Sequence, residues 1–252
     1  MPPRLDRPPI VEALLDFRVD ASDPDDTAES LGAFADSISE AYPTEVDLPQ
    51  VDGMPPAIRA LMAESKTSRL RSADGARTVL VGPSRVTFSV TFDWPDRVYT
   101  SWSDDLVAPA FQVWAAYEEH VRPRALASLA TRFVNRLRVK PDRLDEVLTD
   151  PPSLPSGALT LSSSTDYRTG RTSDGFGARI GRRLGGHGPD TTRATLFLDV
   201  EAFVTYDDDP KPTPLGVDTL AGDLARLDAI KNDLFFSSLT PASLDLYRDD
   251  DA

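Results

Sequence analysis

Several runs of this chain place an apolar residue at every second position, and this alternation constrains the fold more than any other feature of the sequence. The clearest runs lie at 85–93 and 194–206, and a third lies at 9–19 near the start. Side chains of a β-strand point alternately to the two faces of a sheet, so such runs predict strands that bury one face. This pattern is typical of antiparallel sheets, because one face of such a sheet can remain polar.

Two longer segments instead repeat apolar residues every three or four positions, which is the spacing of an amphipathic helix. One covers about 104–121, and the other covers 217–234 near the end of the chain. Thr240 followed by Pro241 predicts the N-cap and first turn of one further short helix. We expect the two long helices to lie over sheet faces, with Phe235 buried beneath the second.

Taken in order, the patterns predict a fold of the α+β class, in which antiparallel sheets are covered by two long amphipathic helices. A first half over 1–140 reads strand, helix, three strands, helix and strand, and a second half over 158–252 reads strands and then the closing helix. A proline-rich connection over 141–157 joins them. The halves are similar only in pattern, which leaves open whether they are separate domains or share one sheet. Besides the segments already given, we expect a helix at 27–42 and strands at 68–73, 77–82, 131–139, 158–167 and 177–183.

Composition narrows the class of protein. The chain of 252 residues has no cysteine, which excludes disulfides, thiolate metal sites and cysteine nucleophiles. No segment resembles a signal peptide or the roughly 18 apolar residues of a membrane span. These absences predict a soluble, cytoplasmic protein with no membrane partner. The formal net charge of −14 argues against a general affinity for nucleic acid, because the summed field repels polyanions.

No constellation of residues in the sequence predicts catalysis. His120 and His187 are far apart and lack the spacing of a metal site. The chain has neither a Gly-x-Ser-x-Gly elbow nor a phosphate-binding loop of the Walker type. We therefore predict no catalytic residue, no metal and no cofactor, and the sequence favours a protein that is not an enzyme.

The most unusual composition lies at 174–189, which combines six glycines with arginines. Arg179, Arg182 and Arg183 can pair with phosphate or carboxylate oxygens, while the glycines let backbone N–H groups approach a ligand. The segment therefore predicts an anion-binding loop. The simpler alternative is a mobile hairpin tip whose glycines serve turns.

A predicted strand in the middle of the chain is the second candidate, because it places three arginines on one face. Arg132 and Arg136, together with Asn135, predict an anion site or a surface that docks a partner. The alternative is a cross-strand network of ion pairs with Glu12 or Asp16, worth about 0.2–1 kcal/mol for each exposed pair.

Three motifs are spread along the chain: Pro-Pro-Ile-Val-Glu-Ala at 8–13, Arg-Phe-Val-Asn-Arg-Leu at 132–137 and Lys-Asn-Asp-Leu-Phe-Phe-Ser-Ser-Leu-Thr at 231–240. Together they resemble a sporadically distributed family of uncharacterised prokaryotic proteins of similar length. The resemblance implies no particular activity, and the patchy distribution implies an accessory role, for example in mobile-element or defence gene sets. The segment at 174–189 is not part of the family pattern. The pattern marks these polar positions as candidates: Glu12, Arg132, Asn135, Arg136, Lys231 and Asn232.

Three functional hypotheses follow. The leading one is a non-enzymatic binding or assembly protein, which works with a protein partner or associates with itself. The alternative is a binder of a small anionic or nucleotide ligand through the arginines. The third is contact with nucleic acid through two basic stretches, 122–143 and 168–193, which requires both to lie on one surface.

Overall fold

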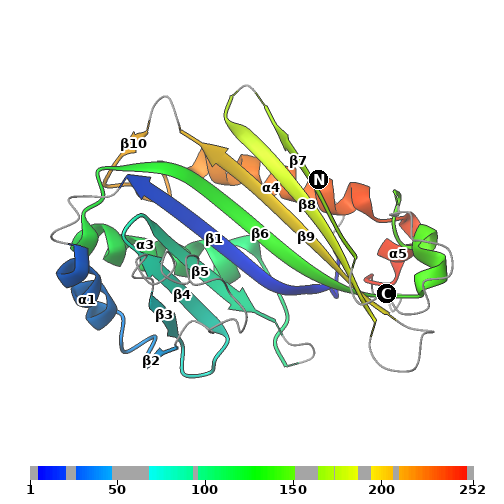
Figure 1. Ribbon diagram of the computed structural model, residues 1–252, viewed down its shortest axis with the longest axis horizontal. Coiled ribbons are helices and arrows are strands. Elements are labelled where there is room, and N and C mark those ends of the chain that lie inside the picture. The colour runs from blue at the N-terminus through cyan, green and yellow to red at the C-terminus, as the bar shows by residue number, and fades with distance from the viewer. Residues whose placement is uncertain are drawn as a thin grey trace, which may run out of the picture.

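The structure, a computed structural model, describes residues 5–20, 27–46, 68–92, 96–150, 164–172, 174–186, 194–206 and 210–248. Within them the strands form one 10-stranded antiparallel sheet in the order β2-β3-β4-β5-β1-β6-β9-β8-β7, and β10 pairs with the start of β6 (Figure 1). The strands are β1 Ile10–Asp20, β2 Thr44–Glu45, β3 Ser68–Arg71, β4 Arg77–Gly82, β5 Arg85–Thr91, β6 Ala125–Val139, β7 Ser164–Arg171, β8 Phe176–Gly186, β9 Ala194–Thr205 and β10 Lys211–Pro212.

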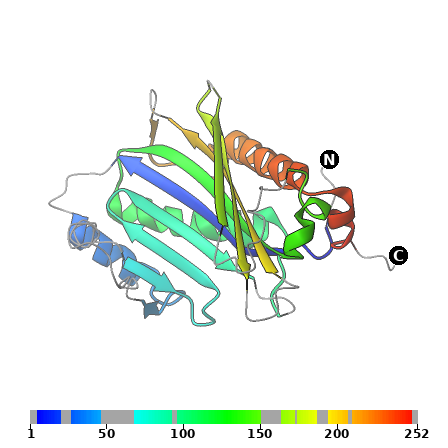
Figure 2. The same ribbon diagram turned by 45° about the vertical axis from the view of Figure 1, so that its right-hand side comes forward.

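The long helices lie on one side of this sheet, behind it in the view of Figure 1. α3 contacts β5, α4 contacts β9 and β6, and α1 packs on α3. Figure 2 shows α4 running along the sheet, with the short α5 beyond its end. The predicted α+β class is thus confirmed. The helices are α1 Thr27–Ser37, the π-helical turn η1 Ser103–Val107, α3 Ala108–Val121, the 3-10 helix η2 Pro141–Glu146, α4 Ala221–Ser238 and α5 Pro241–Asp245.

The alternation in the sequence becomes a division between the two faces of the sheet. Along β9, buried and half-buried residues alternate over the whole strand. Phe133 on β6 lies opposite Ala13 on β1 and Val200 on β9, so these three apolar residues share one face. We call this the helix-covered face. The other, charged face carries Asp16 and Arg132 among its residues, because they occupy the intervening positions.

Two clusters of buried side chains fill the space between the helix-covered face and the helices. The first lies under α3, where the indole ring of Trp114 stacks on Phe17 with 4.7 Å between ring centroids. The second lies under the C-terminal half of α4 and includes Leu198 and Phe235. Phe235 is 9% exposed, which confirms the prediction that it is buried. The N-terminal half of α4 belongs to the first cluster through Leu224 and Leu227, so α4 packs on both clusters.

Both predicted halves contribute strands to the one sheet. β6 from the first half and β9 from the second pair at twelve positions, from Ser128 with Thr205 to Val139 with Ala194. The two halves therefore share a sheet. Residues 158–163 of an expected strand, and His187, lie outside the described residues.

β6 is longer than the alternation predicts, and it starts six residues earlier, at Ala125. The added residues are rich in alanine and leucine and contain no β-branched side chain, so their intrinsic strand propensity is low. Leu126 nevertheless pairs with Val19 on one side and Lys211 on the other. Pairing on both sides thus decides the structure against local preference. α1, conversely, ends at Ser37, before the predicted end at 42.

α4 buries a different set of side chains from the predicted apolar stripe. Val217 precedes the helix and is 42% exposed, and Ile230 and Leu234 are only half-buried. A lysine takes a core position in their place. The buried residues of the helix are Leu224, Leu227, Lys231, Phe235 and Ser238.

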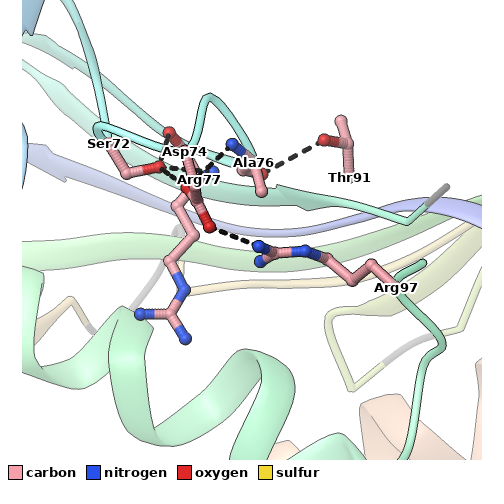
Figure 3. Close-up of polar contacts among 6 residues, drawn as sticks. All are labelled: Ser72, Asp74, Ala76, Arg77, Thr91 and Arg97. Carbon is pink, nitrogen blue, oxygen red and sulfur yellow. Dashed lines mark hydrogen bonds and ion pairs between the residues drawn. The ribbon is translucent and has the colours of Figure 1, made fainter.

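The turn between β3 and β4 is held by one carboxylate (Figure 3). Asp74 accepts hydrogen bonds from the Ser72 hydroxyl at 2.6 Å and from the Ala76 N–H at 3.1 Å, and it forms an ion pair with Arg97. Gly75 adopts a φ of 70°, which glycine reaches without steric cost. The Ser72 hydroxyl, followed by the Ala76 N–H and Arg97, lowers the pKa of Asp74 from 3.8 to about 2.

We expect Asp74→Ala to lower the free energy of unfolding by about 0.5–1 kcal/mol at pH 7, a modest value because the carboxylate is half exposed and screened by solvent. A folded-state pKa below the unfolded one stabilises the protein fully above pH 3.8, and the stabilisation is lost as the pH falls toward about 2. The free energies of unfolding of wild type and Asp74→Ala, measured with urea, should therefore approach each other as the pH falls from 4.5 to 2.5. A constant difference across that range would contradict the assignment.

Candidate functional site

A cavity of about 730 Å³ lies on the helix-covered face, between the two core clusters. Phe133 of the first cluster and Val200 of the second form part of its wall on the sheet side. α4 closes another side, and the segment 98–102 before η1 contributes Tyr99 and Trp102. We call it the Lys231 cavity, after the cationic side chain at its wall.

Lys231 is the central polar residue of this cavity. It is 6% exposed, and its ammonium group contacts Asp228, one turn earlier in α4, at 2.9 Å. The same nitrogen lies 4.1 Å from the ring centroid of Phe133 and 5.2 Å from that of Trp102. Because Asp228 and both rings also line the cavity, the amine lies at the cavity wall and not behind it.

The surroundings of Lys231 act on its charge in opposite directions. Burial lowers the pKa of the amine, because a desolvated ammonium ion loses its hydration, and Asp228 raises it by ion pairing. Burial is the larger effect, so the pKa of Lys231 is lowered. Burial and, secondarily, Asp228 and Asp105 raise the pKa of the neighbouring Tyr99, so its phenol remains a neutral hydrogen-bond donor.

Two amide side chains also line the cavity. Asn135, 2% exposed, donates from Nδ2 to the Leu198 carbonyl at 3.1 Å and to the Phe133 carbonyl at 3.5 Å. Asn232 donates from Nδ2 to Asp228 at 3.2 Å, so Asp228 is held by both of its helical neighbours.

The structure brings together only part of the predicted candidate set. Asn135, Lys231 and Asn232 line the cavity. Arg132 and Arg136 lie on the charged face, so the surface expected from Arg132, Asn135 and Arg136 together does not form. The physical reason is the alternation itself, since neighbouring positions on β6 point to opposite faces. Sequence reasoning missed Tyr99 and Trp102, because their segment shows no periodic pattern.

The charged face carries a second depression of about 440 Å³, which we call the arginine groove. Arg132 holds Asp199 through two hydrogen bonds, of 2.7 and 2.5 Å, and Arg179 pairs with Glu201 at 3.1 Å. The Asp199 carboxylate, and more distantly Glu12, raises the pKa of Arg132. Arg132 therefore forms a cross-strand ion pair, but with Asp199 of β9 and not with Glu12 or Asp16 of β1 as the alternative had it.

Within the arginine groove, a group of charged side chains surrounds Asp16. Its carboxylate, in a residue that is 4% exposed, accepts from the Nε of Arg85 and the hydroxyl of Thr87, each at 2.5 Å. The Nε of Arg18 is 3.3 Å away. Arg18 and Arg85 also lie directly opposite each other on β1 and β5, an arrangement that is unfavourable for like charges.

In the glycine- and arginine-rich segment, the strand expected at 177–183 is confirmed, and the anion-binding loop is not formed. Most of the segment is β8, which pairs with β7 on one side and with β9 on the other. Arg179 and Arg183 lie on the charged face, the latter over the Phe197 ring at 4.7 Å. Arg182 lies on the helix-covered face, 6% exposed, and donates to the Asp150 carbonyl at 2.5 Å. The three arginines therefore cannot bind one anion together.

Gly177 shows why glycine is needed in this strand. A Cβ atom there would lie 2.4 Å from the Phe203 ring, so the glycine allows the ring to pack against the β8 backbone. This close packing accounts for Gly177 without any ligand.

Comparison with protein-family models and with curated proteins finds no match to the chain. The part of the chain that the structure describes contains no group of three or more histidine, aspartate or glutamate side chains arranged to hold a metal. Among the described helices, none has both the length and the apolar character needed to cross a membrane.

Proposed function

We propose that the protein is a binding protein for a small, largely apolar organic molecule, which occupies the Lys231 cavity. The single observation that carries this proposal is a buried lysine at the wall of a cavity of about 730 Å³. Ligand pockets have volumes of about 300–1,000 Å³ and combine apolar walls with a few convergent polar groups. Burying a lysine is costly, so its position beside an apolar cavity favours a role in recognition.

The lining indicates the chemistry of the ligand. Five aromatic residues favour a planar ring, because aromatic side chains pack well against flat faces. Lys231 is balanced by Asp228, and Asp6 adds a second carboxylate, so an anionic ligand gains little from the local charge. The amine, however, can donate a hydrogen bond. We therefore expect a neutral planar molecule with an acceptor such as a carbonyl oxygen. The aromatic residues are Tyr99, Trp102, Phe133, Phe235 and Phe236.

The neutral naphthalene ketone prodan is a suitable probe, because its fluorescence shifts to the blue in an apolar site. We expect wild-type protein to bind prodan, and Lys231→Met to weaken the binding about tenfold or more, since a hydrogen bond from a charged donor contributes about 1.5–3 kcal/mol. Fluorescence titration measures both affinities.

Lys211→Met is the matched control for this experiment. Lys211 also forms an ion pair and lies 4.8 Å from an aromatic ring centroid, but it does not line the cavity. Its replacement should leave prodan affinity unchanged. The fold should tolerate Lys231→Met, because methionine is flexible enough to fill the space of the lysine stem, and the Asp228 carboxylate left behind is 31% exposed and still accepts a hydrogen bond from Asn232. Equal prodan affinity for wild type and Lys231→Met, or no binding at all, would contradict the proposal.

The arginine groove supports a second candidate function, the binding of a small anionic ligand. Four arginines and three carboxylates line the groove, so one positive charge is in excess. Arg18 and Arg85 each use Nε for Asp16, which leaves their terminal nitrogens as donors for phosphate or sulfate oxygens. This arrangement favours an anion near Asp16 over one near Arg136, which is exposed and lies outside the groove.

The other two functional hypotheses have less support. A role in protein binding or assembly stays a prediction, and Phe235, which lies in the core as predicted, offers no exposed aromatic surface to a partner. Contact with nucleic acid also stays a prediction. Arginines of both basic stretches reach the charged face, but β9 runs between them and its Asp199 and Glu201 offset their charge.

A further inference from the structure

The amine of Lys231 has the surroundings that reversible covalent chemistry requires. It lies at the wall of a cavity with the volume of a small organic molecule, and the rings of Phe133 and Trp102 lie within 5.2 Å of its nitrogen and offer no hydrogen-bond acceptor in their planes. One carboxylate, Asp228, stands within proton-transfer distance at 2.9 Å. A lysine in such a site can act as a nucleophile, because an apolar environment favours the neutral amine.

We infer that Lys231 captures an aromatic aldehyde or ketone in the cavity as an imine, an inference that rests on the ligand-binding function proposed above. Asp228 accepts a proton from the ammonium group, and the neutral Nζ attacks the carbonyl carbon. A C–N bond forms while the carbonyl π electrons move to oxygen, and a proton passes from nitrogen to oxygen. The resulting carbinolamine loses its hydroxyl as water, with the proton that Asp228 holds. The nitrogen keeps its one hydrogen, so the product is a protonated imine beside the Asp228 carboxylate.

The balance of this reaction needs no additional reagent. One ammonium group and one carbonyl compound give one protonated imine and one water, and Asp228 ends as the carboxylate that it was at the start. The lowered pKa of Lys231 raises the neutral fraction of the amine, whereas an ordinary lysine with a pKa of about 10.4 is almost wholly protonated at pH 7. The apolar walls also limit the access of water, which would hydrolyse the imine.

Reduction by cyanoborohydride converts the imine into a stable secondary amine, so the capture can be read by mass. Wild-type protein is incubated at pH 7 with 2-naphthaldehyde and sodium cyanoborohydride, and the adducts are located by peptide mass spectrometry. The chain has only four lysines, Lys66, Lys140, Lys211 and Lys231, so each can be followed separately. We expect Lys231 to be labelled at least tenfold faster than Lys140 or Lys211.

Lys211 is the internal control, because it shares with Lys231 an ion pair and an aromatic neighbour but lies outside the cavity. Lys231→Arg is the control variant, since it keeps a cationic donor and lacks the primary amine. It should show no adduct at position 231. Circular dichroism of the variant checks that it is folded.

The outcomes separate the two proposals. If labelling follows exposure, so that exposed Lys140 is modified as fast as Lys231, the proposal that Lys231 forms an imine is wrong. If prodan still binds in that case, the cavity is a binding site without covalent chemistry. If prodan does not bind and 2-naphthaldehyde does not label Lys231, the proposed function is wrong as well. Selective labelling of Lys231 that excess prodan suppresses supports both.

Discussion

Replacing Trp114 by alanine is expected to lower the free energy of unfolding by about 3–5 kcal/mol, as is typical when a large aromatic side chain is removed from a core. The side chain is fully buried and stacks on Phe17 on one side and on Tyr117, with 5.8 Å between centroids, on the other. Its indole N–H also donates to the Leu215 carbonyl at 3.0 Å. The substitution therefore removes packing, two ring contacts and a buried hydrogen bond together.

Urea unfolding followed by circular dichroism measures this loss, and a thermal melt should show a decrease of roughly 10 °C for a chain of this size. Leu246→Ala is the matched control, because Leu246 is 73% exposed and its truncation should change stability by less than about 0.5 kcal/mol. A loss below about 1.5 kcal/mol for Trp114→Ala would show that the core under α3 is not packed as described.

Replacing Asp16 by alanine is expected to lower the free energy of unfolding by about 2–3 kcal/mol. The carboxylate is the only side-chain acceptor that the described residues offer to Arg85 and the Thr87 hydroxyl, so its loss leaves the buried hydroxyl without a partner. It also leaves Arg18 and Arg85 facing each other. The cost falls below the 3–5 kcal/mol typical of a fully buried pair, because the two arginine side chains are 61% and 41% exposed.

Urea unfolding again measures this cost, and Asp245→Ala is the control, since Asp245 forms an exposed ion pair with Arg248 worth about 0–1 kcal/mol. The variant also tests the arginine groove. At equal ionic strength, sulfate should stabilise Asp16→Ala more than Asp245→Ala, because an anion can replace the missing carboxylate. Equal gains for both variants would reflect only the general effect of sulfate and would remove support for an anion site.

The regular parts of the fold could be predicted because their sequence pattern and their environment agree. In β5 and β9 every second side chain enters the core, so the alternation is visible in the sequence. The start of β6 could not be predicted, because Ala125 and Leu126 form a strand only through the neighbours on both sides. Those neighbours come from distant parts of the chain. A local pattern carries no information about such pairing.

The candidate site was predictable only in its polar half. Asn135, Lys231 and Asn232 were marked by the resemblance to a family, whereas the helical stripe assigned the core side of α4 to Ile230 and Leu234. A lysine interrupts an apolar pattern, so periodicity alone assigns it to solvent. The rings that surround it come from irregular chain before η1 and from β6. Only the assembled fold shows that these segments meet.

The arginines of β6 also protect the sheet against incorrect pairing. A shift of one residue between β6 and its neighbours would turn Phe133 outward and place Arg132, Arg136 and Arg138 beneath the helices. Three unpaired guanidinium groups in an apolar core would cost far more than the few kilocalories by which folded proteins are stable. The misregistered sheet is therefore strongly disfavoured. These charges thus select the register of the central strands, whether or not any ligand ever reaches the charged face.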